Sequence, residues 1–543
     1  MKLSEKGLQN KKQWEQAGFA LPAFAREAVK ERTAKEPLWI HFGAGNIFRA
    51  FQANMVQKLL NEGKMDRGVI VAEGFDYEIV EKVLRPHEEY SILVTLKADG
   101  TMEKSVVGSI TESVLLNAQD EKEFQRMKEI FRCASLQMVS FTITEKGYSL
   151  YDGKGELLQA VKEDFERGPE KPCSYMGMTA ALLYERFQAG EKPIAMVSMD
   201  NCSHNGDRLH EAMAAFARNW TERNLVEQGF ASYINCPQKV SFPWTMIDKI
   251  TPRPDASVQQ ALEEDGAEDM QIVVTARNTY TAPFVNAEEC EYLVVEDAFP
   301  NGRPPLEHSG VFFTDRETVD KVEKMKVCTC LNPLHTALAV FGCLLGYQKI
   351  SDEMKDPDLR LLVEKIGYEE GLPVVTHPGI LDPKKFLDTV LYVRFPNPFM
   401  PDTPQRIATD TSQKLAVRFG ETIRAYHASE HLHTEDLRLI PLVFAGWLRY
   451  LTGVDDRGET LTLSPDPLLE RLCPLLAKAE FGKQEDAEAL LKEILKDREI
   501  FGVDLYEAGM ARNVCRYFEK MMEGPGAVRR VLREALKKPV CQH

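Results

Sequence analysis

The sequence has few of the features that mark membrane, secreted or nucleic-acid-binding proteins. No uninterrupted apolar run reaches the roughly 18 residues of a membrane span, and the N-terminal segment MKLSEKGLQNKKQWEQ has no apolar stretch of the secretory-signal type. Positive charge is in deficit: the formal net charge is −16, which argues against sequence-independent binding to nucleic acid or to an anionic membrane. We therefore expect a cytoplasmic protein with no nucleic-acid or membrane partner. An anionic small substrate is still compatible, because it needs only a local basic pocket.

Metal-binding cysteine patterns are also absent. The eleven cysteines include no CxxC pair, and the only close pair, Cys328 and Cys330, has poor spacing for zinc. We expect reduced thiols and no metal site. The sequence shows no internal repeat and no low-complexity segment.

The 543 residues, 44% of them hydrophobic, are enough for two or three domains with large cores. Residues 1–36 are polar and predict a peripheral helical arm. Residues 37–310 alternate strand-like and helix-like segments, which predicts an α/β sheet covered on both faces. Helical periodicity dominates residues 311–543, after the Gly- and Pro-rich connection NGRPPLEHSG. The predicted fold is an α/β Rossmann-type domain followed by a mainly α-helical domain.

A strand, a glycine turn and a helix follow one another in LWIHFGAGNIFRAF, residues 38–51. This unit can place a pyrophosphate on a helix N-terminus. A lone GxG is a weak signal, and the third glycine of the usual fingerprint is replaced here by phenylalanine. The flanking strand and helix strengthen it. The residues of this unit expected to bind a dinucleotide are Gly43, Gly45, Asn46, Phe48 and Arg49.

The next predicted strand, GVIVAEG, ends in Glu73. An acidic residue there suits a ribose diol and disfavours a 2′-phosphate, which favours NAD over NADP. Asp76 competes for this role, and both residues are alternatively plain loop carboxylates.

Further strands are predicted at residues 90–96, 104–110, 138–144 and 194–200, and ligands of such sheets bind beyond the carboxyl ends of the strands. Polar residues lie at the predicted ends of three of these strands: Gly108-Ser109, TEKGY (144–148) and DNCSHNGD (200–207). Ser109 is expected to contact the cofactor and Asn201 the substrate. Alternatively, Asp200 and Asn201 merely turn the chain and cap the next helix.

The segment KVCTCLNPLHTALAVFGCL, residues 326–344, predicts a short extended run and then a helix with Asn332 as its N-cap and Pro333 in first position. Asn332 and His335 are three residues apart and share a face of the first turn. Lys326 lies on the incoming segment. An amine, a carboxamide and an imidazole suit the polarisation of a carbonyl or alcohol oxygen and the movement of its proton. The alternative is an Asn cap, a core-facing His and a surface Lys.

Two further places carry candidate substrate ligands. Asp248 lies in a short apolar context within FPWTMIDKITP. Arg406 and Lys414 are eight residues apart and share a face if that stretch is helical. They could clamp a carboxylate or a polyol, or be ordinary surface cations.

With these motifs assembled, the chain resembles the mannitol dehydrogenase family of polyol-specific long-chain dehydrogenases over nearly its whole length. That family includes mannitol 2-dehydrogenases, fructuronate reductases (mannonate oxidoreductases) and tagaturonate reductases. The resemblance rests on an ordered series of segments: HFGAGNIFRAFQ (41–52), VVGSI (106–110), TITEKGY (142–148), SMDNCSHNGD (198–207), FPWTMIDKITP (242–252), LNPLHTALA (331–339), RFPNPFMPDTPQRIATDTSQKL (394–415) and GWLRYLTGVDDRG (446–458).

The resemblance implies a Rossmann-type domain, a helical C-terminal domain, and metal-free catalysis at their interface with a lysine acid/base. Matched position by position, the acid/base corresponds to Lys326, the two asparagines that hold the reacting oxygen to Asn201 and Asn332, the substrate-contacting histidine to His335, and the remaining substrate-binding residues to Asp248, Arg406 and Lys414.

The chain departs from the family in two places. The family usually has its lysine five residues before the asparagine, whereas Lys326 is six before Asn332. In an extended segment one extra residue turns a side chain to the other side, unless a bulge absorbs it. The second departure is Pro333-Leu334, where the family commonly has small residues, and it bears on the shape of the substrate pocket.

The resulting hypothesis is NAD-dependent hydride transfer at a CH–OH group of an open-chain sugar acid or polyol. Two basic groups opposite the reacting end favour a carboxylate, hence the D-fructuronate/D-mannonate pair of hexuronate metabolism. The Arg406/Lys414 pair alone does not decide this, because the polyol users of the family have similar cations. Mannitol/fructose comes second and tagaturonate third. The rival of another class is a non-catalytic NAD-binding relative, which the shifted lysine spacing motivates.

Overall fold

A computed structural model of the protein describes residues 1–483 and 486–537. The chain forms two compact units, here called the first unit (residues 1–97 and 101–320) and the second unit (residues 98–100 and those from 321 onward).

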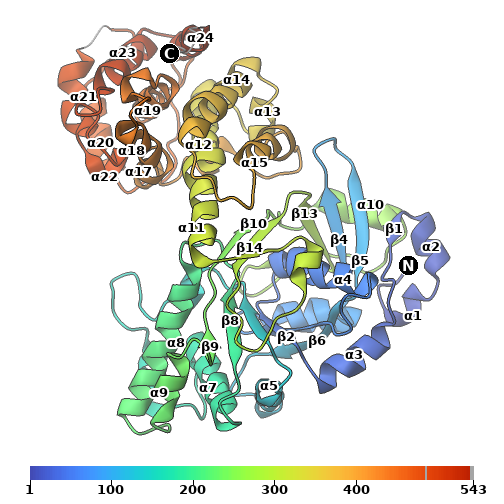
Figure 1. Ribbon diagram of the computed structural model, residues 1–543. Coiled ribbons are helices and arrows are strands. Elements are labelled where there is room, and N and C mark those ends of the chain that lie inside the picture. The colour runs from blue at the N-terminus through green and yellow to red at the C-terminus, as the bar shows by residue number, and fades with distance from the viewer. Residues whose placement is uncertain (484–485, 538–543) are drawn as a thin grey trace. The chain divides into compact units, whose positions relative to one another are not determined.

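The first unit is built on a six-stranded parallel sheet (Figure 1). Numbered along the chain, its strands lie in the spatial order 3-2-1-4-5-6, which is that of a doubly wound dinucleotide-binding sheet. The order reverses between β2 and β7, and at such a switch point the carboxyl ends of the strands form the ligand crevice. From edge to edge the strands are β6 (Ile110–Leu115), β3 (Val69–Glu73), β2 (Trp39–Phe42), β7 (Met138–Phe141), β8 (Ile194–Ser198) and β9 (Val240–Ser241).

Both faces of this sheet are buried, which explains why its strands are apolar throughout rather than alternating. Ile40 and Phe42 of β2 belong to one hydrophobic cluster, whereas Trp39 of the same strand belongs to another. Helices such as α7 and α8 cover the sheet (Figure 1). The helices of this unit are α1 (Glu5–Leu8), α2 (Lys11–Gln16), α3 (Arg26–Lys35), α4 (Ala53–Asn61), α5 (Glu121–Arg132), α6 (Gln159–Arg167), α7 (Tyr175–Gln188), α8 (Asn205–Glu222), α9 (Gly229–Ile234) and α10 (Ala256–Glu264).

Two of the predicted strands belong to another sheet. β4 (Ser91–Leu96) and β5 (Met102–Val107) pair antiparallel in a four-stranded sheet of order β1-β5-β4-β13. The connection between them is too short for the crossover of a dozen or more residues that parallel neighbours require. The prediction of one strand over 104–110 is therefore wrong, because β5 ends at Val107 and β6 begins at Ile110. The other strands are β1 (Phe19–Ala20), β10 (Thr245–Asp248), β11 (Val273–Val274), β12 (Tyr280–Thr281), β13 (Phe284–Glu288), β14 (Tyr292–Glu296) and β15 (Phe312–Thr314).

The N-terminal residues are packed into the first unit rather than peripheral to it. Trp14 and Phe19 are buried, and β1 pairs with β5. The buried guanidinium of Arg26 donates hydrogen bonds to the carbonyl oxygens of Gly108 and Ile110 at 3.0 and 3.1 Å. These residues therefore tie the start of β6 to the N-terminal helices.

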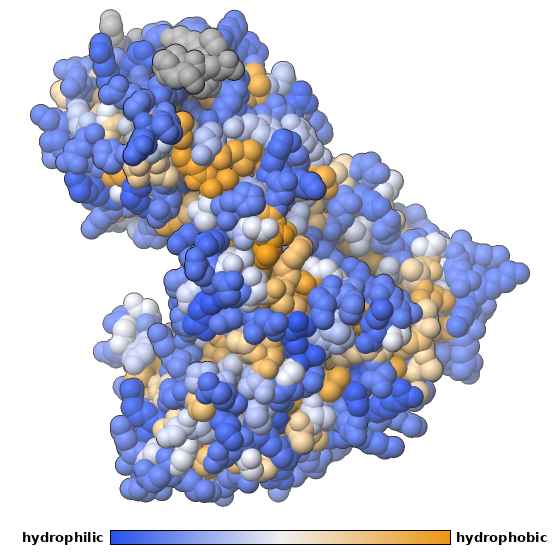
Figure 2. Space-filling model, viewed as in Figure 1, coloured by the Kyte–Doolittle hydropathy of each residue, from blue (hydrophilic) through white to orange (hydrophobic). Residues whose placement is uncertain are grey.

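The second unit is helical, and its described residues contain no strand. Its buried apolar helices α12 and α19 pack together. Most of the face shown in Figure 2 is hydrophilic, in keeping with the net charge of −16. The helices are α12 (Asn332–Leu345), α13 (Ile350–Glu353), α14 (Pro357–Lys365), α15 (Pro383–Thr389), α16 (Pro404–Ile407), α17 (Leu415–Arg418), α18 (Gly420–Ala428), α19 (Leu439–Tyr450), α20 (Leu469–Leu476), α21 (Ala487–Leu495), α22 (Arg498–Phe501), α23 (Ala511–Met522) and α24 (Ala527–Lys537).

The prediction of an extended segment before α12 is wrong. Helix α11 (Arg316–Met325) continues into a π-helical turn, η6 (Lys326–Cys330), and then into α12. Within the described residues, this run from Arg316 to Leu345 is long and apolar enough to cross a membrane on length and composition alone. However, 83% of its most apolar window is buried inside the protein, as in a core helix. Polar residues interrupt the run, so it contains no uninterrupted apolar stretch of that length.

Candidate functional site

The glycine turn after β2 lies at the switch point of the parallel sheet. Gly43 has φ of +107°, and a Cβ atom on it would lie 2.3 Å from the carbonyl oxygen of Thr142, which follows β7. Only glycine fits this close approach. At Gly45 a Cβ would meet nothing within 4 Å, so the backbone there is open to a ligand. An open glycine backbone beyond the strand ends fits a dinucleotide pyrophosphate.

The side chains that follow the turn lie behind it. Phe48 is fully buried and stacks on His41, with ring centroids 4.3 Å apart. Arg49 is also fully buried, and burial lowers the pKa of its guanidinium to about 9. It donates hydrogen bonds to the Asn46 side-chain oxygen at 2.8 Å and to the Ala282 carbonyl at 2.6 Å. Both residues therefore support the turn from the interior, and a direct contact between either side chain and a cofactor stays a prediction.

The two candidate ribose carboxylates are both held by the protein. Glu73 accepts the Ala44 N–H at 2.7 Å with one oxygen, and the N–H groups of Phe75 and Asp76 at 2.8 and 2.9 Å with the other. Burial raises the pKa of Glu73, and the three backbone donors oppose that rise. Asp76 accepts the Thr275 hydroxyl at 2.6 Å. Glu73 thus joins the end of β3 to the glycine turn.

Ser109 lies at the amino ends of the strands of the parallel sheet, opposite the carboxyl ends where the glycine turn lies. Its hydroxyl is fully buried and donates to the Ala53 carbonyl at 2.6 Å. Its own carbonyl accepts the N–H of Val69 at the start of β3, the amino end of the strand. The expectation that Ser109 follows the carboxyl end of a strand arose from reading β5 and the start of β6 as one strand.

Asp200 organises the loops beyond β7 and β8. Its carboxylate accepts the N–H groups of Ile143 and Thr144, both at 2.9 Å, and the hydroxyl of Tyr148 at 2.5 Å. Thr144 is held at φ of +65°, a conformation that β-branched residues rarely adopt and that persists only where the surroundings enforce it. Asn201 follows on this ordered loop and is exposed.

The helix after this loop does not begin at the Asp200–Asn201 pair. Helix α8 begins at Asn205, and its N-cap is His204, with φ of +50°. The Asn205 side chain donates to the Asp200 carbonyl at 3.0 Å. The alternative interpretation is that Asp200 and Asn201 turn the chain and cap the next helix. The chain does turn at Asp200, but neither residue caps α8.

Tyr175, a residue for which the sequence predicts no role, lies at the first position of α7. Its hydroxyl oxygen is buried and has no hydrogen-bond partner among the described residues. A Cβ on Gly74, next to Glu73, would lie 2.6 Å from the tyrosine ring. The carboxyl edge of the sheet thus holds an unused hydrogen-bonding group beside β3, which also fits a bound polar ligand. A lone tyrosine after an N-cap serine gives no sequence signal for this.

In the second unit, Lys326 is the first residue of the π-turn. The Leu331 N–H donates to the Lys326 carbonyl at 3.0 Å, the five-residue spacing that defines such a turn. The residue is only 4% exposed, so the alternative of a surface lysine is wrong. A π-turn takes up one extra residue within a helix. It therefore does in a helix what a bulge does in a strand, and it can absorb the extra residue between Lys326 and Asn332.

Helix α12 starts at Asn332, preceded by Leu331, so Asn332 is not an N-cap. One turn on, His335 packs against Phe395, with ring centroids 5.1 Å apart. Its Nε2 lies 3.6 Å from a carboxylate oxygen of Asp402, too far for a hydrogen bond, and has no hydrogen-bond partner among the described residues. Burial lowers the pKa of His335 to about 4. The imidazole is therefore neutral at pH 7.

Arg406 and Lys414 do not share a helix. Arg406 lies in α16, Lys414 lies between a 3-10 turn and α17, and Asp410 between them has φ of +53°. The two side chains are nevertheless close enough for the charge of Arg406 to affect the pKa of Lys414. Burial lowers the pKa of both His335 and Lys414, and the charge of Arg406, which pairs with Asp402, adds to both shifts.

Two more cations belong to this group. Arg418, whose pKa burial lowers to about 10, donates to the Thr336 hydroxyl at 2.5 Å. Its charge and that of Arg394 also lower the pKa of His335. The group formed by His335, Arg394, Arg406, Lys414 and Arg418 is called the basic cluster below. The negative charge of Asp402 raises the pKa of His335 and so opposes the effect of the three arginines.

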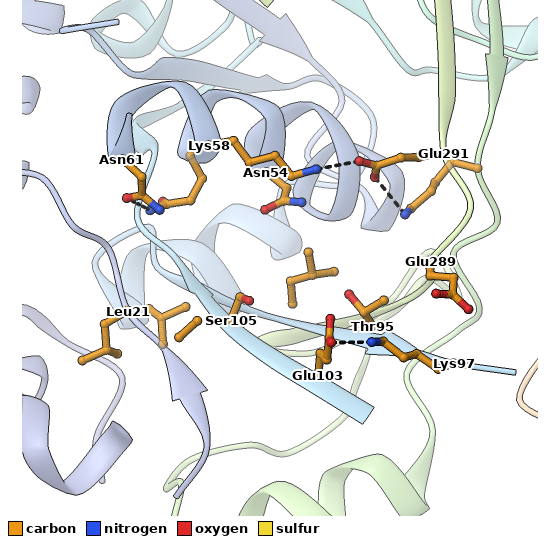
Figure 3. A pocket seen from close by; sticks show the side chains of 15 residues that line it. Leu21, Asn54, Lys58, Asn61, Thr95, Lys97, Glu103, Ser105, Glu289 and Glu291 are labelled. Atoms are coloured by element: carbon orange, nitrogen blue, oxygen red, sulfur yellow. Dashed lines mark hydrogen bonds and ion pairs between the residues drawn. The ribbon is translucent and has the colours of Figure 1, made fainter. Parts of the chain in front are cut away.

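One candidate residue and one cavity remain to be placed in the structure. Asp248 is the last residue of β10 and is buried. A cavity of about 350 Å³ lies between α4 and the β4–β5 hairpin, and its lining includes none of the predicted site residues (Figure 3). There Glu291 accepts hydrogen bonds from Lys58 and Lys249 at 2.7 and 3.0 Å. Among the residues that the structure describes, no three His, Cys, Asp or Glu side chains are grouped to hold a metal ion, and the ten cysteines are free.

A doubly wound sheet with an open glycine turn, followed in the chain by a helical unit with a basic cluster, defines a Rossmann-type oxidoreductase with an appended helical domain. Two family descriptions match the chain: the mannitol dehydrogenase Rossmann domain over residues 38–308 and the mannitol dehydrogenase C-terminal domain over residues 318–522. The chain belongs to the mannitol dehydrogenase family, whose members are oxidoreductases acting on CH–OH groups. The predicted fold class and the family resemblance are confirmed.

Several relatives cover almost the whole chain. The D-mannonate oxidoreductase of Thermotoga maritima is 51% identical over 538 residues, which are 99% of each chain. The polyol:NADP oxidoreductase of Gluconobacter oxydans is 29% identical over 87% of this chain and 91% of its own. Among solved structures, Pseudomonas fluorescens mannitol 2-dehydrogenase in complex with NAD and D-mannitol has a TM-score of 0.68 at 28% identity, with coverage of 99% and 100%. A D-sorbitol dehydrogenase at 24% identity and a TM-score of 0.79, with coverage of 95% and 98%, supports the fold.

Proposed function

We propose that the protein is a cytoplasmic, NAD(H)-dependent oxidoreductase that interconverts D-fructuronate and D-mannonate. The observation that carries the proposal is the basic cluster in the second unit, where the charges of three arginines add to burial in lowering the pKa of one neutral histidine, and where two of these arginines, Arg406 and Arg418, also act on Lys414. A sugar acid carries a carboxylate that such a cluster can bind, whereas a neutral polyol does not. The 51% identical relative from Thermotoga maritima, a D-mannonate oxidoreductase, points to the same substrate.

The first unit supplies the cofactor groups. Gly43 allows the tight turn against Thr142, Gly45 leaves the backbone open for the pyrophosphate, and Glu73 lies at the end of β3, where a carboxylate suits the adenosine ribose. Bound NAD(H) supplies or accepts the hydride. The solved relative that holds NAD supports this cofactor.

Lys326 is the proposed acid/base. During ketone reduction its ammonium gives a proton to the oxygen that becomes the alcohol, and during oxidation its amine takes that proton back. Its burial keeps the group away from bulk water. Asn332 and Asn201 each donate a hydrogen bond to the developing alkoxide, and a preorganised donor of this kind is worth on the order of 3 kcal/mol.

The basic cluster positions the acid end of the substrate. Arg406 is 60% exposed and its partner Asp402 is shared with His335, so a substrate carboxylate can compete for its guanidinium. Neutral His335 acts as a hydrogen-bonding group rather than as a second acid. Asp248, at the end of β10, is the proposed ligand of a substrate hydroxyl.

The test is a panel of substrates with NADH oxidation as the readout. We expect the highest kcat/KM for D-fructuronate, with D-fructose and D-tagaturonate lower. Equal turnover of D-fructose would instead indicate a mannitol 2-dehydrogenase, and a preference for D-tagaturonate a tagaturonate reductase. No turnover of any of them, in a protein that binds NADH, would indicate a non-catalytic relative. Activity that survives exhaustive EDTA treatment would support the proposed metal-free mechanism.

A further inference from the structure

An exposed aromatic side chain follows the carboxyl end of β3. Phe75 is 60% exposed, although single exposed apolar side chains are common on protein surfaces and need a second observation before they indicate a site. Its backbone N–H is held by Glu73 at 2.8 Å. The ring therefore projects from an ordered turn.

A guanidinium from a distant segment lies over this ring. The Cζ atom of Arg277 is 4.7 Å from the ring centroid of Phe75, within the range of a cation–π contact. The loop that carries Arg277 is tied to the same turn, since Thr275 donates its hydroxyl to Asp76 at 2.6 Å and the Ala276 N–H donates to Glu78 at 3.3 Å. Two ordered segments thus present one flat, solvent-facing pair.

The pair lies on the adenosine side of the predicted dinucleotide site. Glu73 accepts the N–H of Ala44 within the glycine turn, so the turn that carries Phe75 and the pyrophosphate turn share one carboxylate. In doubly wound sheets the acidic residue at the end of the second strand binds the adenosine ribose. Phe75, two residues further on, is therefore placed for the base attached to that ribose.

We propose that Phe75, with Arg277, is the platform on which the adenine of the dinucleotide stacks. Neither residue belongs to the glycine motif or to the predicted catalytic set. The inference rests on the proposed use of NAD(H). Stacking of a base on an aromatic ring explains why a phenyl group that is 60% exposed stands at this turn.

The test is calorimetric binding of ADP-ribose and of nicotinamide mononucleotide to the full-length protein. Phe75→Ala should weaken ADP-ribose about tenfold, as expected for one lost base–aromatic stack, and leave nicotinamide mononucleotide unchanged. Phe75→Trp should retain ADP-ribose binding, and Arg277→Ala should weaken it two- to threefold by loosening the ring. The matched control is Tyr151→Ala, an exposed aromatic of the same unit that is 53% exposed.

Unchanged ADP-ribose affinity in Phe75→Ala, or an equal loss of both ligands, would overturn the adenine platform while leaving the proposed function standing. Failure of the wild-type protein to bind NADH or ADP-ribose would instead overturn the proposed function itself, and the platform with it.

Discussion

A buried acid in the second unit should make the protein less stable as the pH rises. Glu353, at the end of α13, is fully buried, and neither of its carboxylate oxygens has a hydrogen-bond partner among the described residues. It lies against α12, where a Cβ on Gly342 would be 2.2 Å from one of those oxygens. Burial raises its pKa well above 4.5, so the folded protein holds a proton that the unfolded chain releases.

The sign and the size are set by proton linkage. Below pH 4.5 both states are protonated and the group has no effect. Above that value each pH unit lowers the free energy of unfolding by about 1.4 kcal/mol until the pKa of the folded state is passed. The upper limit at pH 7 is therefore about 3 kcal/mol relative to a side chain that does not titrate.

The substitution Glu353→Gln removes the titration and keeps the shape. We expect the thermal midpoint of the variant to exceed that of the wild type by a margin that grows from pH 5 to pH 7 to several degrees, at about 2–4 °C per kcal/mol for a domain of this size. Differential scanning calorimetry across that range measures it.

The matched control is Glu370, which is equally buried but whose carboxylate accepts the N–H groups of Arg438, Leu439 and Ile440 at 2.8, 2.8 and 2.9 Å. Glu370→Gln should lower the midpoint, because one amide nitrogen replaces an oxygen that those donors need. A gap between Glu353→Gln and the wild type that stays constant with pH would refute the reasoning.

Three further predictions concern the site. Lys326→Ala should lower kcat by at least a hundredfold in both directions, as expected for loss of a general acid/base, and a loss below about tenfold would exclude that role. Arg406→Ala should raise KM for D-fructuronate about tenfold with little change in kcat, the loss expected for one exposed charge-assisted contact; an equal rise for neutral D-fructose would contradict carboxylate binding. Because the pKa of His335 is about 4, kcat/KM should show no histidine titration between pH 6 and 8, and a His335→Gln variant should keep the wild-type pH profile there; a step near pH 6.5 that vanishes in the variant would contradict a neutral imidazole.

The parts of this protein that the sequence predicted are those with strong local patterns. The glycine turn follows an apolar strand and precedes a helix, so the segment around Gly43 indicated a nucleotide site. The helical second unit was indicated by periodicity. In both cases the neighbouring residues along the chain determine the structure.

The prediction errors arose where contacts with residues distant in the sequence determine the structure. The β4–β5 hairpin has the same apolar pattern as the strands of the parallel sheet, and only the short connection between the two strands shows that it belongs elsewhere. The π-turn at Lys326 contains valine and threonine, which favour extended structure, but α11 and α12 enclose it in one helix. The guanidinium over Phe75 and one hydrogen-bond acceptor of Arg49 come from beyond residue 270, so these contacts have no local signal in the sequence.

The widened turn at Lys326 also affects how relatives of this chain are compared. A helix that gains one residue by local widening can keep the register of its later turns, so an insertion of that kind need not rotate the rest of the helix away from its neighbours. The distance along the chain between a lysine and an asparagine is then a poor measure of whether two proteins share a mechanism. A gap in a sequence alignment at this place then reflects a difference in the width of one helical turn and does not show that the lysine has a different role.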